Sequence, residues 1–283
     1  MASNEERREA AKRKLEARLE RPKQPSSWTK RLTIAGTIVA IVLAAGLGLY
    51  FVVQQAQQET PEAAEDGTGE VDDSALHIPT ERAPVPERPA ELGETQSCDY
   101  GPGAGEASRA VEPPEDGEVP ARGRVDVVLE STEGDIPLTL DRSLAPCTVH
   151  SMINLIEQDF YDDTACHRLG TQGLQMLQCG DPDGDGTGGP GYTIPDEHFD
   201  ELHYGRGLLA MARTPEPNSG GSQFFMVYGH AELPPEYTVF GTIGDAGLQI
   251  LDSVAHDGIA TPGEDGTGPP NTEVRFTDAT VEG

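Results

Sequence analysis

The sequence predicts a mainly β domain with two helices, placed behind an acidic linker and one membrane-spanning helix. Residues 121–283 hold about eight short apolar runs with Gly-rich turns between them, and two stretches with helical periodicity. Residues 32–53 form a mostly apolar run without a charge, and residues 54–120 are rich in Pro, Glu, Ala and Gly. Many short strands with such turns favour a β-sandwich or a closed barrel.

The N-terminal region predicts a membrane anchor. Residues 1–31 carry ten basic and five acidic residues, a net charge of +5, and we interpret them as a solvated cytoplasmic tail. The apolar run 32–53 spans roughly 30 Å as a helix, about one bilayer core. No basic residue follows it until Arg82, so the positive-inside rule places the C-terminal domain outside the cytoplasm, on a single-pass protein of the cell membrane. A cleaved signal peptide is the alternative, but its apolar core is normally about 7–15 residues.

The remainder of the chain is strongly acidic. After residue 31 it carries ten Arg, no Lys and 44 acidic residues, a net charge of −34. Such a charge repels nucleic acid, so we expect no nucleic-acid partner. Residues 54–120 have few large apolar side chains and are predicted to be a disordered linker. Cys98 and Tyr100 near its end hint that its last part docks on the domain.

The first elements of the domain are a hairpin and a helix. Residues 124–131 and 134–141 are apolar runs on either side of a short turn, which is typical of a β-hairpin. Residues 145–161 then carry apolar residues at helical spacing, with Pro146 at the start.

Further strands and a second helix follow. Residues 245–258 predict the helix, with Gly258 as its C-cap. The other runs predict strands, and they are residues 165–170, 174–181, 207–213, 221–229, 237–244 and 272–282.

The stretch CHRLGTQGLQMLQCGD at 166–181 concentrates the residues with chemical potential. A thiol nucleophile needs its base within hydrogen-bond reach, but neighbours on a strand point to opposite faces, so Cys166 and His167 cannot form that pair. With Cys179 they give neither a C-x-x-C pair nor an obvious fourth zinc ligand. DPDGDG at 181–186 resembles the start of a calcium loop, but Tyr192 stands where the bidentate Glu belongs. We interpret it as an acidic turn and expect no metal.

Arg168 is the remaining candidate. A symmetric hairpin over 165–181 sets Arg168 directly across from Gln178. A guanidinium backed by an amide is a rigid array of hydrogen-bond donors. A surface arginine in a salt bridge is the alternative, and the arginine alone does not decide between them.

Three further motifs decide the family resemblance. GLLAMAR at 207–213, NSGGSQFFMVYG at 218–229 and YTVFGTI at 237–243 follow in order after CHRL, MLQCGD and GTGGPGY. Together they resemble the cyclophilin family of peptidyl-prolyl cis–trans isomerases, over residues 121–283. The layout of basic tail, anchor, acidic linker and C-terminal domain resembles actinobacterial membrane-anchored cyclophilins.

The resemblance implies a closed eight-stranded antiparallel β-barrel capped by two α-helices. It also implies that an X-Pro segment of an unfolded or partly folded protein lies across one face. By motif position, Arg168 matches the catalytic arginine and Gln178 the glutamine that supports the bound peptide. Met176, Phe225 and Leu233 match the wall of the proline pocket. The rest of the groove matches Ala212, Gln223 and the loop from Gly186 to Gly189.

Several positions depart from the family pattern while remaining substrate-binding candidates. Gln175 replaces an aromatic residue and is expected to weaken the apolar pocket. Arg213 replaces an Asn, and Tyr237 replaces a His while keeping an aromatic wall. Glu232 replaces the Trp that cyclosporin-type ligands use, and two extra residues lie between Arg168 and Gln178.

The four cysteines suggest disulfides, because they follow the predicted anchor and would lie in an oxidising compartment. Cys166 and Cys179 would oppose each other on the hairpin, and Cys98 with Cys147 would tie the linker end to the first helix. Other pairings, or free thiols, stay open.

The function expected from the resemblance is isomerase activity that accelerates the folding of extracytoplasmic proteins, by a monomer without a cofactor. Two alternatives stay open. The domain could be a catalytically weak binding module or chaperone for proline-containing segments, which Gln175, Arg213 and Glu232 motivate. It could also be an envelope scaffold in which the acidic linker is the working part.

Overall fold

The structure, a computed structural model, describes residues 76–282. The predicted cytoplasmic tail, the apolar run 32–53 and the first part of the predicted linker lie outside these residues. None of the helices within 76–282 combines the length and the apolar character that a bilayer crossing requires.

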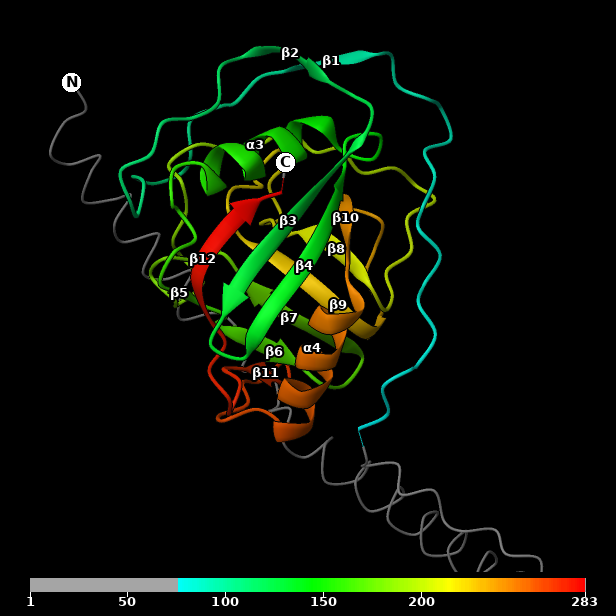
Figure 1. The fold of residues 1–283 in the computed structure, drawn as a ribbon, viewed down its shortest axis with the longest axis vertical. Coiled ribbons are helices and arrows are strands. Elements are labelled where there is room, and N and C mark those ends of the chain that lie inside the picture. Colours follow the sequence, from blue (N-terminus) through cyan, green and yellow to red (C-terminus); the bar gives the residue numbers. More distant parts are fainter. Residues whose placement is uncertain (1–75, 283) are drawn as a thin grey trace, which may run out of the picture. The chain divides into compact units, whose positions relative to one another are not determined.

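One antiparallel sheet forms the body of the domain (Figure 1). Its strand order is β11-β6-β7-β9-β8-β10-β4-β3-β12-β5. The strands are β3 (Arg124–Ser131), β4 (Gly134–Asp141), β5 (Thr164–Ala165), β6 (Arg168–Gly170), β7 (Leu174–Cys179), β8 (Leu208–Met211), β9 (Phe224–Ala231), β10 (Val239–Ile243), β11 (Thr267–Gly268) and β12 (Arg275–Val281). The predicted hairpin is confirmed as β3 and β4, paired residue by residue from Arg124–Asp141 to Ser131–Gly134.

The sheet is a curled half-barrel, not the closed eight-stranded barrel that the resemblance implies. Its order has two ends, the two-residue strands β11 and β5. The run 165–170, predicted as one strand, is divided: Ala165 pairs with β12 and Arg168 pairs with β7. Between them the Cys166 N–H bonds to the Val274 carbonyl and the His167 N–H bonds to the Gln178 carbonyl. The run therefore changes partner at its middle, which interrupts the ladder.

Two helices lie near the strands, as predicted. α3 (Pro146–Ile156) begins with its proline in the first turn, and its Cys147 and Thr148 N–H groups donate to the Glu197 carboxylate over 3.0 and 2.8 Å. Glu197 comes from a distant loop and occupies the place of an N-cap side chain. α4 (Asp245–Asp257) is followed by Gly258 with φ +80°, which confirms the predicted glycine C-cap.

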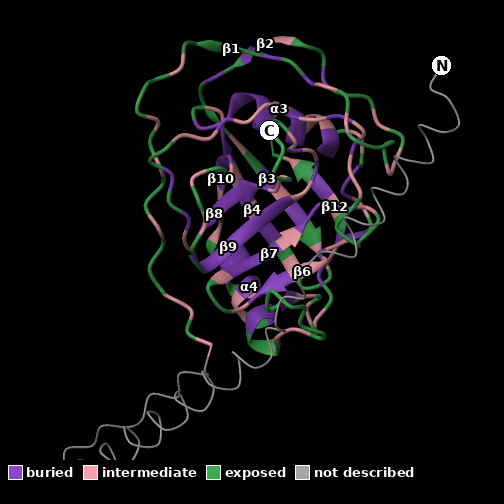
Figure 2. Ribbon diagram, turned by 180° about the vertical axis from the view of Figure 1, so that it is seen from behind, coloured by how far each residue is buried: buried purple, intermediate pink, exposed green. Residues whose placement is uncertain are grey.

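The core lies between the curled sheet and the helices. Figure 2 shows the strands at the centre of the domain as mostly buried. Apolar residues from β3, β4, β7, β9 and α3 line this space. Its largest fully buried aromatic side chains are Tyr161, Tyr228, Phe160, Phe224, Phe240 and Phe276. The rigid sheet fixes the positions of the side chains on its other face.

Residues 76–120, here called the N-terminal segment, differ from the predicted disordered linker. Figure 1 shows this segment running along one side of the domain and over α3, where β1 (Thr95–Cys98) pairs with β2 (Gly117–Pro120). Cys98, Tyr100 and Val119 are buried. Cys98 forms a disulfide with Cys147 in α3. The hint that this part docks on the domain is confirmed.

Arginines attach the first half of the N-terminal segment. Arg82 donates to the Ile243 carbonyl over 2.7 Å and to Asp245 at the start of α4 over 2.6 Å. Arg88 donates to the Leu144 and Glu197 carbonyls over 2.8 and 2.7 Å. Amino-acid composition registers these arginines only as polar residues. It therefore does not reveal that their hydrogen bonds to specific carbonyls hold the N-terminal segment on the domain.

Candidate active site

Arg168 and Gln178 form the centre of the candidate site. The register of β6 and β7 pairs Arg168 with Gln178, as the symmetric hairpin predicts. The Arg168 Nη1 group donates to Gln178 Oε1 over 3.2 Å. Gln178 Nε2 in turn donates to Gln223 Oε1 over 2.9 Å. The three side chains therefore form a directed hydrogen-bond chain along the face of the sheet.

A pocket of about 130 Å³ with one apolar wall opens beside this chain. Arg168 and Gln178 provide its polar edge. Phe225 and Tyr237 meet edge to face, with ring centroids 5.7 Å apart. The other lining residues are Leu174, Met176, Ala212, Arg213 and Leu233. Of the residues that the sequence assigns to the proline pocket, Met176, Phe225, Leu233 and Tyr237 come together here.

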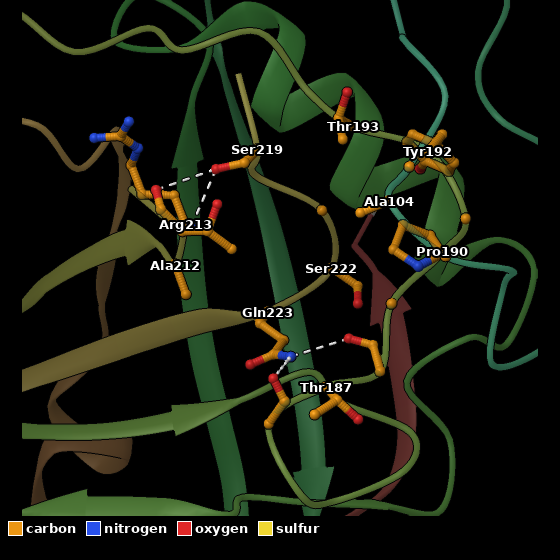
Figure 3. A pocket seen from close by; sticks show the side chains of 18 of the residues that line it. Ala104, Thr187, Pro190, Tyr192, Thr193, Ala212, Arg213, Ser219, Ser222 and Gln223 are labelled. Atoms are coloured by element: carbon orange, nitrogen blue, oxygen red, sulfur yellow. Dashed lines mark hydrogen bonds between the residues drawn. The ribbon is translucent and has the colours of Figure 1, made fainter. Parts of the chain in front are cut away.

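A second pocket of about 260 Å³ adjoins the first and shares Gln178, Ala212 and Arg213 with it. Figure 3 shows Gln223 in the wall of this second pocket, and its Nε2 group donates to the Gly186 and Gly188 carbonyls over 3.0 and 2.9 Å. The predicted groove loop from Gly186 to Gly189 forms one wall. Residues 103–106 of the N-terminal segment form another. This wall was not foreseen, because the segment was predicted to be disordered.

Asp265 and Thr267 hold the outer side of Arg168. Arg168 Nη2 lies 2.9 Å from Asp265 Oδ2, and Nε donates to Thr267 Oγ1 over 2.8 Å. The Thr267 backbone N–H, the Thr267 hydroxyl and Arg168 lower the pKa of Asp265 to about 2. Nothing in the sequence marks these two residues, which lie nearly a hundred positions from Arg168 in a Gly-rich loop. Leu174 was also missed, although it precedes Met176 by two positions and so shares its strand face.

The comparison with known protein families matches the part of the chain that contains the candidate site. The family model of cyclophilin-type peptidyl-prolyl cis–trans isomerases matches residues 124–281. The chain belongs to this cyclophilin family. The match begins at β3 and ends in β12, so it contains the sheet, both helices and all of the pocket residues named above except those of the N-terminal segment.

Named relatives extend the similarity beyond the cyclophilin domain. A probable peptidyl-prolyl cis–trans isomerase B of Mycobacterium leprae is 39% identical, with 97% of each chain covered. The corresponding protein of Mycobacterium tuberculosis is 44% identical over 68% of this chain and 66% of its own. A crystal structure of a cyclophilin-type isomerase of Cryptosporidium parvum is 29% identical, covering 57% of this chain and 99% of that one, with a TM-score of 0.48.

Gln175 is the predicted site residue that the structure places elsewhere. Met176 lines the cyclophilin pocket, so its neighbour on β7 faces the other way. Gln175 is only 5% exposed; its Nε2 group donates to the His77 carbonyl over 2.8 Å and its Oε1 accepts the His230 N–H over 2.7 Å. Gln175 is not among the residues that line the pocket, and its side chain binds the N-terminal segment, so its expected effect on the pocket stays a prediction.

Arg213 lies at the site, but its charge is already engaged. Its side chain is about 10% exposed, and its guanidinium contacts the carboxylates of Asp196 at 3.8 Å and Glu236 at 3.4 Å. In Figure 3 the guanidinium points away from Gln223. Arg213 therefore shapes the rim with its backbone and aliphatic part. Glu232 is exposed and donates its N–H to the Gly173 carbonyl in the enlarged β6–β7 turn.

The cysteines and the acidic turn have structural roles. Cys166 and Cys179 form a disulfide beside the Arg168–Gln178 pair, so neither carries the thiol that nucleophilic catalysis requires. The carboxylate of Asp181, which is fully buried, accepts the N–H groups of Asp183 and Gly186 over 2.9 and 2.6 Å. Asp181 thus shapes the acidic turn that carries the groove loop.

Proposed function

We propose that this protein is a peptidyl-prolyl cis–trans isomerase that accelerates the folding of extracytoplasmic proteins. The observation that carries the proposal is the position of Arg168, whose guanidinium lies across from the apolar wall of the pocket and is oriented by Gln178. Membership of the cyclophilin family and the similarity to proteins named as isomerases support it. The substrate is an X-Pro segment of an unfolded or partly folded chain.

The site suits the chemistry of prolyl isomerisation. The barrier to rotation is about 20 kcal/mol and arises from amide resonance. No nucleophile, metal or cofactor is needed, because catalysis requires only that the site bind the twisted amide more tightly than either planar isomer. In the twisted amide the prolyl nitrogen becomes pyramidal and gains a lone pair. Arg168 donates a hydrogen bond to that lone pair, and Met176, Phe225 and Leu233 hold the ring.

The energetic demand on the site is moderate. A rate gain of about 10⁵ requires roughly 7 kcal/mol of preferential stabilisation of the transition state. A charged donor that is already oriented costs little reorganisation when the amide twists. The apolar wall removes water from the proline ring and strengthens the hydrogen bond from Arg168.

Exchange NMR on a short X-Pro peptide tests the activity. The purified full-length chain should bring cis and trans signals into fast exchange, and Arg168→Ala should lower the exchange rate by one to three decades while the domain stays folded. Turnover equal to wild type in a folded Arg168→Ala variant would remove the role of Arg168. Peptide binding without exchange in the wild type would instead support the binding-module alternative.

The proposal includes the location of the domain. The uncharged run 32–53, with basic residues before it, supports a single membrane anchor. The two disulfides support an oxidising compartment. Protease added to intact spheroplasts should remove the domain and leave a membrane-bound N-terminal fragment, whereas protection of the domain would contradict the orientation. Light scattering of the purified chain should give the mass of a monomer.

A further inference from the structure

Asp265 and Thr267 hold one edge of the Arg168 guanidinium. Nε donates to Thr267 Oγ1 over 2.8 Å, and Nη2 donates to Asp265 Oδ2 over 2.9 Å. Nε and Nη2 lie on the same side of the planar group, so the two acceptors bind it as a fork. Gln178 Oε1 accepts from Nη1 on the other side. The guanidinium is therefore contacted from two sides, by β7 and by the turn from Asp265 into the start of β11.

The two acceptors are fixed to each other. Asp265 Oδ1 accepts the Thr267 backbone N–H over 3.0 Å and its hydroxyl over 2.9 Å. Gly266 between them has φ +73°, a conformation that disfavours side chains and that closes this tight turn. Thr267 pairs with Gly170 in β6, the strand of Arg168 itself. The turn is thus attached to the same strand as the arginine that it contacts.

The donor count shows what remains for a substrate. A guanidinium has five N–H groups. One goes to Thr267, one to Asp265 and one to Gln178. Among the contacts within residues 76–282, one N–H of Nη1 and one of Nη2 remain without a partner. The turn therefore determines where the donors available to the prolyl nitrogen point.

We propose that Asp265 is a positioning residue of the isomerase: its carboxylate orients the Arg168 guanidinium so that the free Nη N–H groups face the proline pocket. This inference rests on the proposed catalytic role of Arg168. Asp265 does not touch the substrate; it acts through Arg168. The contact persists through the neutral pH range, because the carboxyl group stays ionised there.

Two substitutions separate charge from turn structure. Asp265→Asn keeps an oxygen that can accept the Thr267 N–H but removes the ionic contact with Arg168. Asp265→Ala removes both. We expect kcat for a short X-Pro peptide to fall about tenfold in Asp265→Ala and less in Asp265→Asn, with KM changed by less than about twofold. A merely structural role would lower the melting temperature and leave kcat per folded molecule unchanged.

A direct readout of the arginine accompanies the kinetics. The ¹⁵N–¹H signal of Arg168 Nε reports its hydrogen bond to Thr267, and it should shift and exchange faster with water in Asp265→Ala. Asp245→Asn is the matched control, because it breaks the ion pair with Arg82 at the start of α4, away from the pocket. That variant should keep both kcat and the Arg168 signal.

A double-mutant cycle tests whether Asp265 acts through Arg168. If Asp265 acts through Arg168, adding Asp265→Ala to Arg168→Ala causes no further loss of kcat. An additional tenfold loss in the double variant would overturn the inference. Wild-type kcat in Asp265→Ala, with turnover still lost in Arg168→Ala, would also overturn it while leaving the proposed function intact. Wild-type kcat in Arg168→Ala would remove the proposed catalytic role of Arg168, whereas a folded wild-type chain that causes no cis–trans exchange would overturn the proposed function itself.

Discussion

Arg168 and Gln178 face each other across β6 and β7, and the arginine donates to the amide oxygen over 3.2 Å. The contact couples the proposed donor to a chain that continues through Gln223 to the carbonyls of the groove loop. The same guanidinium is held on its other edge by the turn at Asp265. The proposed orientation of Arg168 therefore depends on residues spread over nearly a hundred positions.

Gln178→Ala should reduce turnover without abolishing it. The variant removes one of three contacts to the Arg168 guanidinium and leaves Gln223 without its donor. A hydrogen bond to a charged group contributes about 1.5–3 kcal/mol, so a fall of about tenfold or more in kcat is expected. Exchange NMR on an X-Pro peptide measures it, and an unchanged rate would show that the turn alone orients Arg168.

Gln175→Ala should lower stability but not turnover. The substitution leaves the His230 N–H and the His77 carbonyl without their partner in a partly buried site. We expect the free energy of unfolding to fall by about 1–3 kcal/mol and the region around residue 77 to lose protection from hydrogen exchange. Gln172→Ala, in the nearby exposed turn, is the control. If kcat fell in a fully folded Gln175→Ala variant, Gln175 would have to be counted among the residues of the active site.

The two disulfides should contribute unequally. Cys98 and Cys147 are 49 positions apart, and Cys166 and Cys179 are 13 apart. Loop-closure entropy predicts losses of about 4 and about 3 kcal/mol on their removal. Urea unfolding of Cys98→Ser/Cys147→Ser and Cys166→Ser/Cys179→Ser measures this. A larger loss for the shorter loop would mean that native packing outweighs chain entropy.

Acid should destabilise the domain through His167. Both ring nitrogens are buried and, within residues 76–282, have no hydrogen-bond partner. Burial lowers the pKa of His167, although the nearby Asp181 opposes the shift. The unfolded chain then binds the proton more readily, so stability is complete above about pH 6.5 and falls as pH drops toward the folded-state pKa.

His167→Gln tests this sign. Its urea midpoint should depend less on pH between about pH 7 and pH 5 than that of the wild type. His203→Gln, at an exposed loop position, should keep the wild-type slope. Burial also lowers the pKa of His150, so part of the acid sensitivity should remain. A midpoint that falls as steeply as in wild type would assign the effect to other groups.

Local periodicity predicted most elements of the domain. The β3–β4 hairpin, both helices and the Arg168–Gln178 register follow from alternation, helical spacing and turn residues, which act over a few positions. The predicted helix 145–161 is longer than α3, which ends at Ile156. Phe160 lies in the turns that follow and is nevertheless buried, because burial does not require a helix. Arg168, Met176, Phe225 and Leu233 were found through ordered motifs.

Contacts between distant parts of the chain escaped prediction. Asp265 approaches Arg168 only because β11 pairs with β6. Gln175 was assigned to the pocket by its neighbour, although adjacent strand residues face opposite sides. Residues 76–120 look like a linker in composition, yet arginine–carbonyl contacts and one disulfide order them. The contacts of Asp265 and of residues 76–120 involve partners that no local pattern specifies, whereas strand alternation already separates Gln175 from Met176.

The Cys98–Cys147 disulfide has a consequence for how the domain is produced. The family match begins at residue 124, which invites cutting the chain close to that point. Such a cut removes Cys98 together with Tyr100, whose hydroxyl donates to the Cys147 carbonyl over 3.1 Å. An unpaired, uncovered thiol then remains on α3, and oxidation joins two molecules through it. The resulting dimer would be an artefact of truncation, and its disappearance on adding reductant would identify it as one.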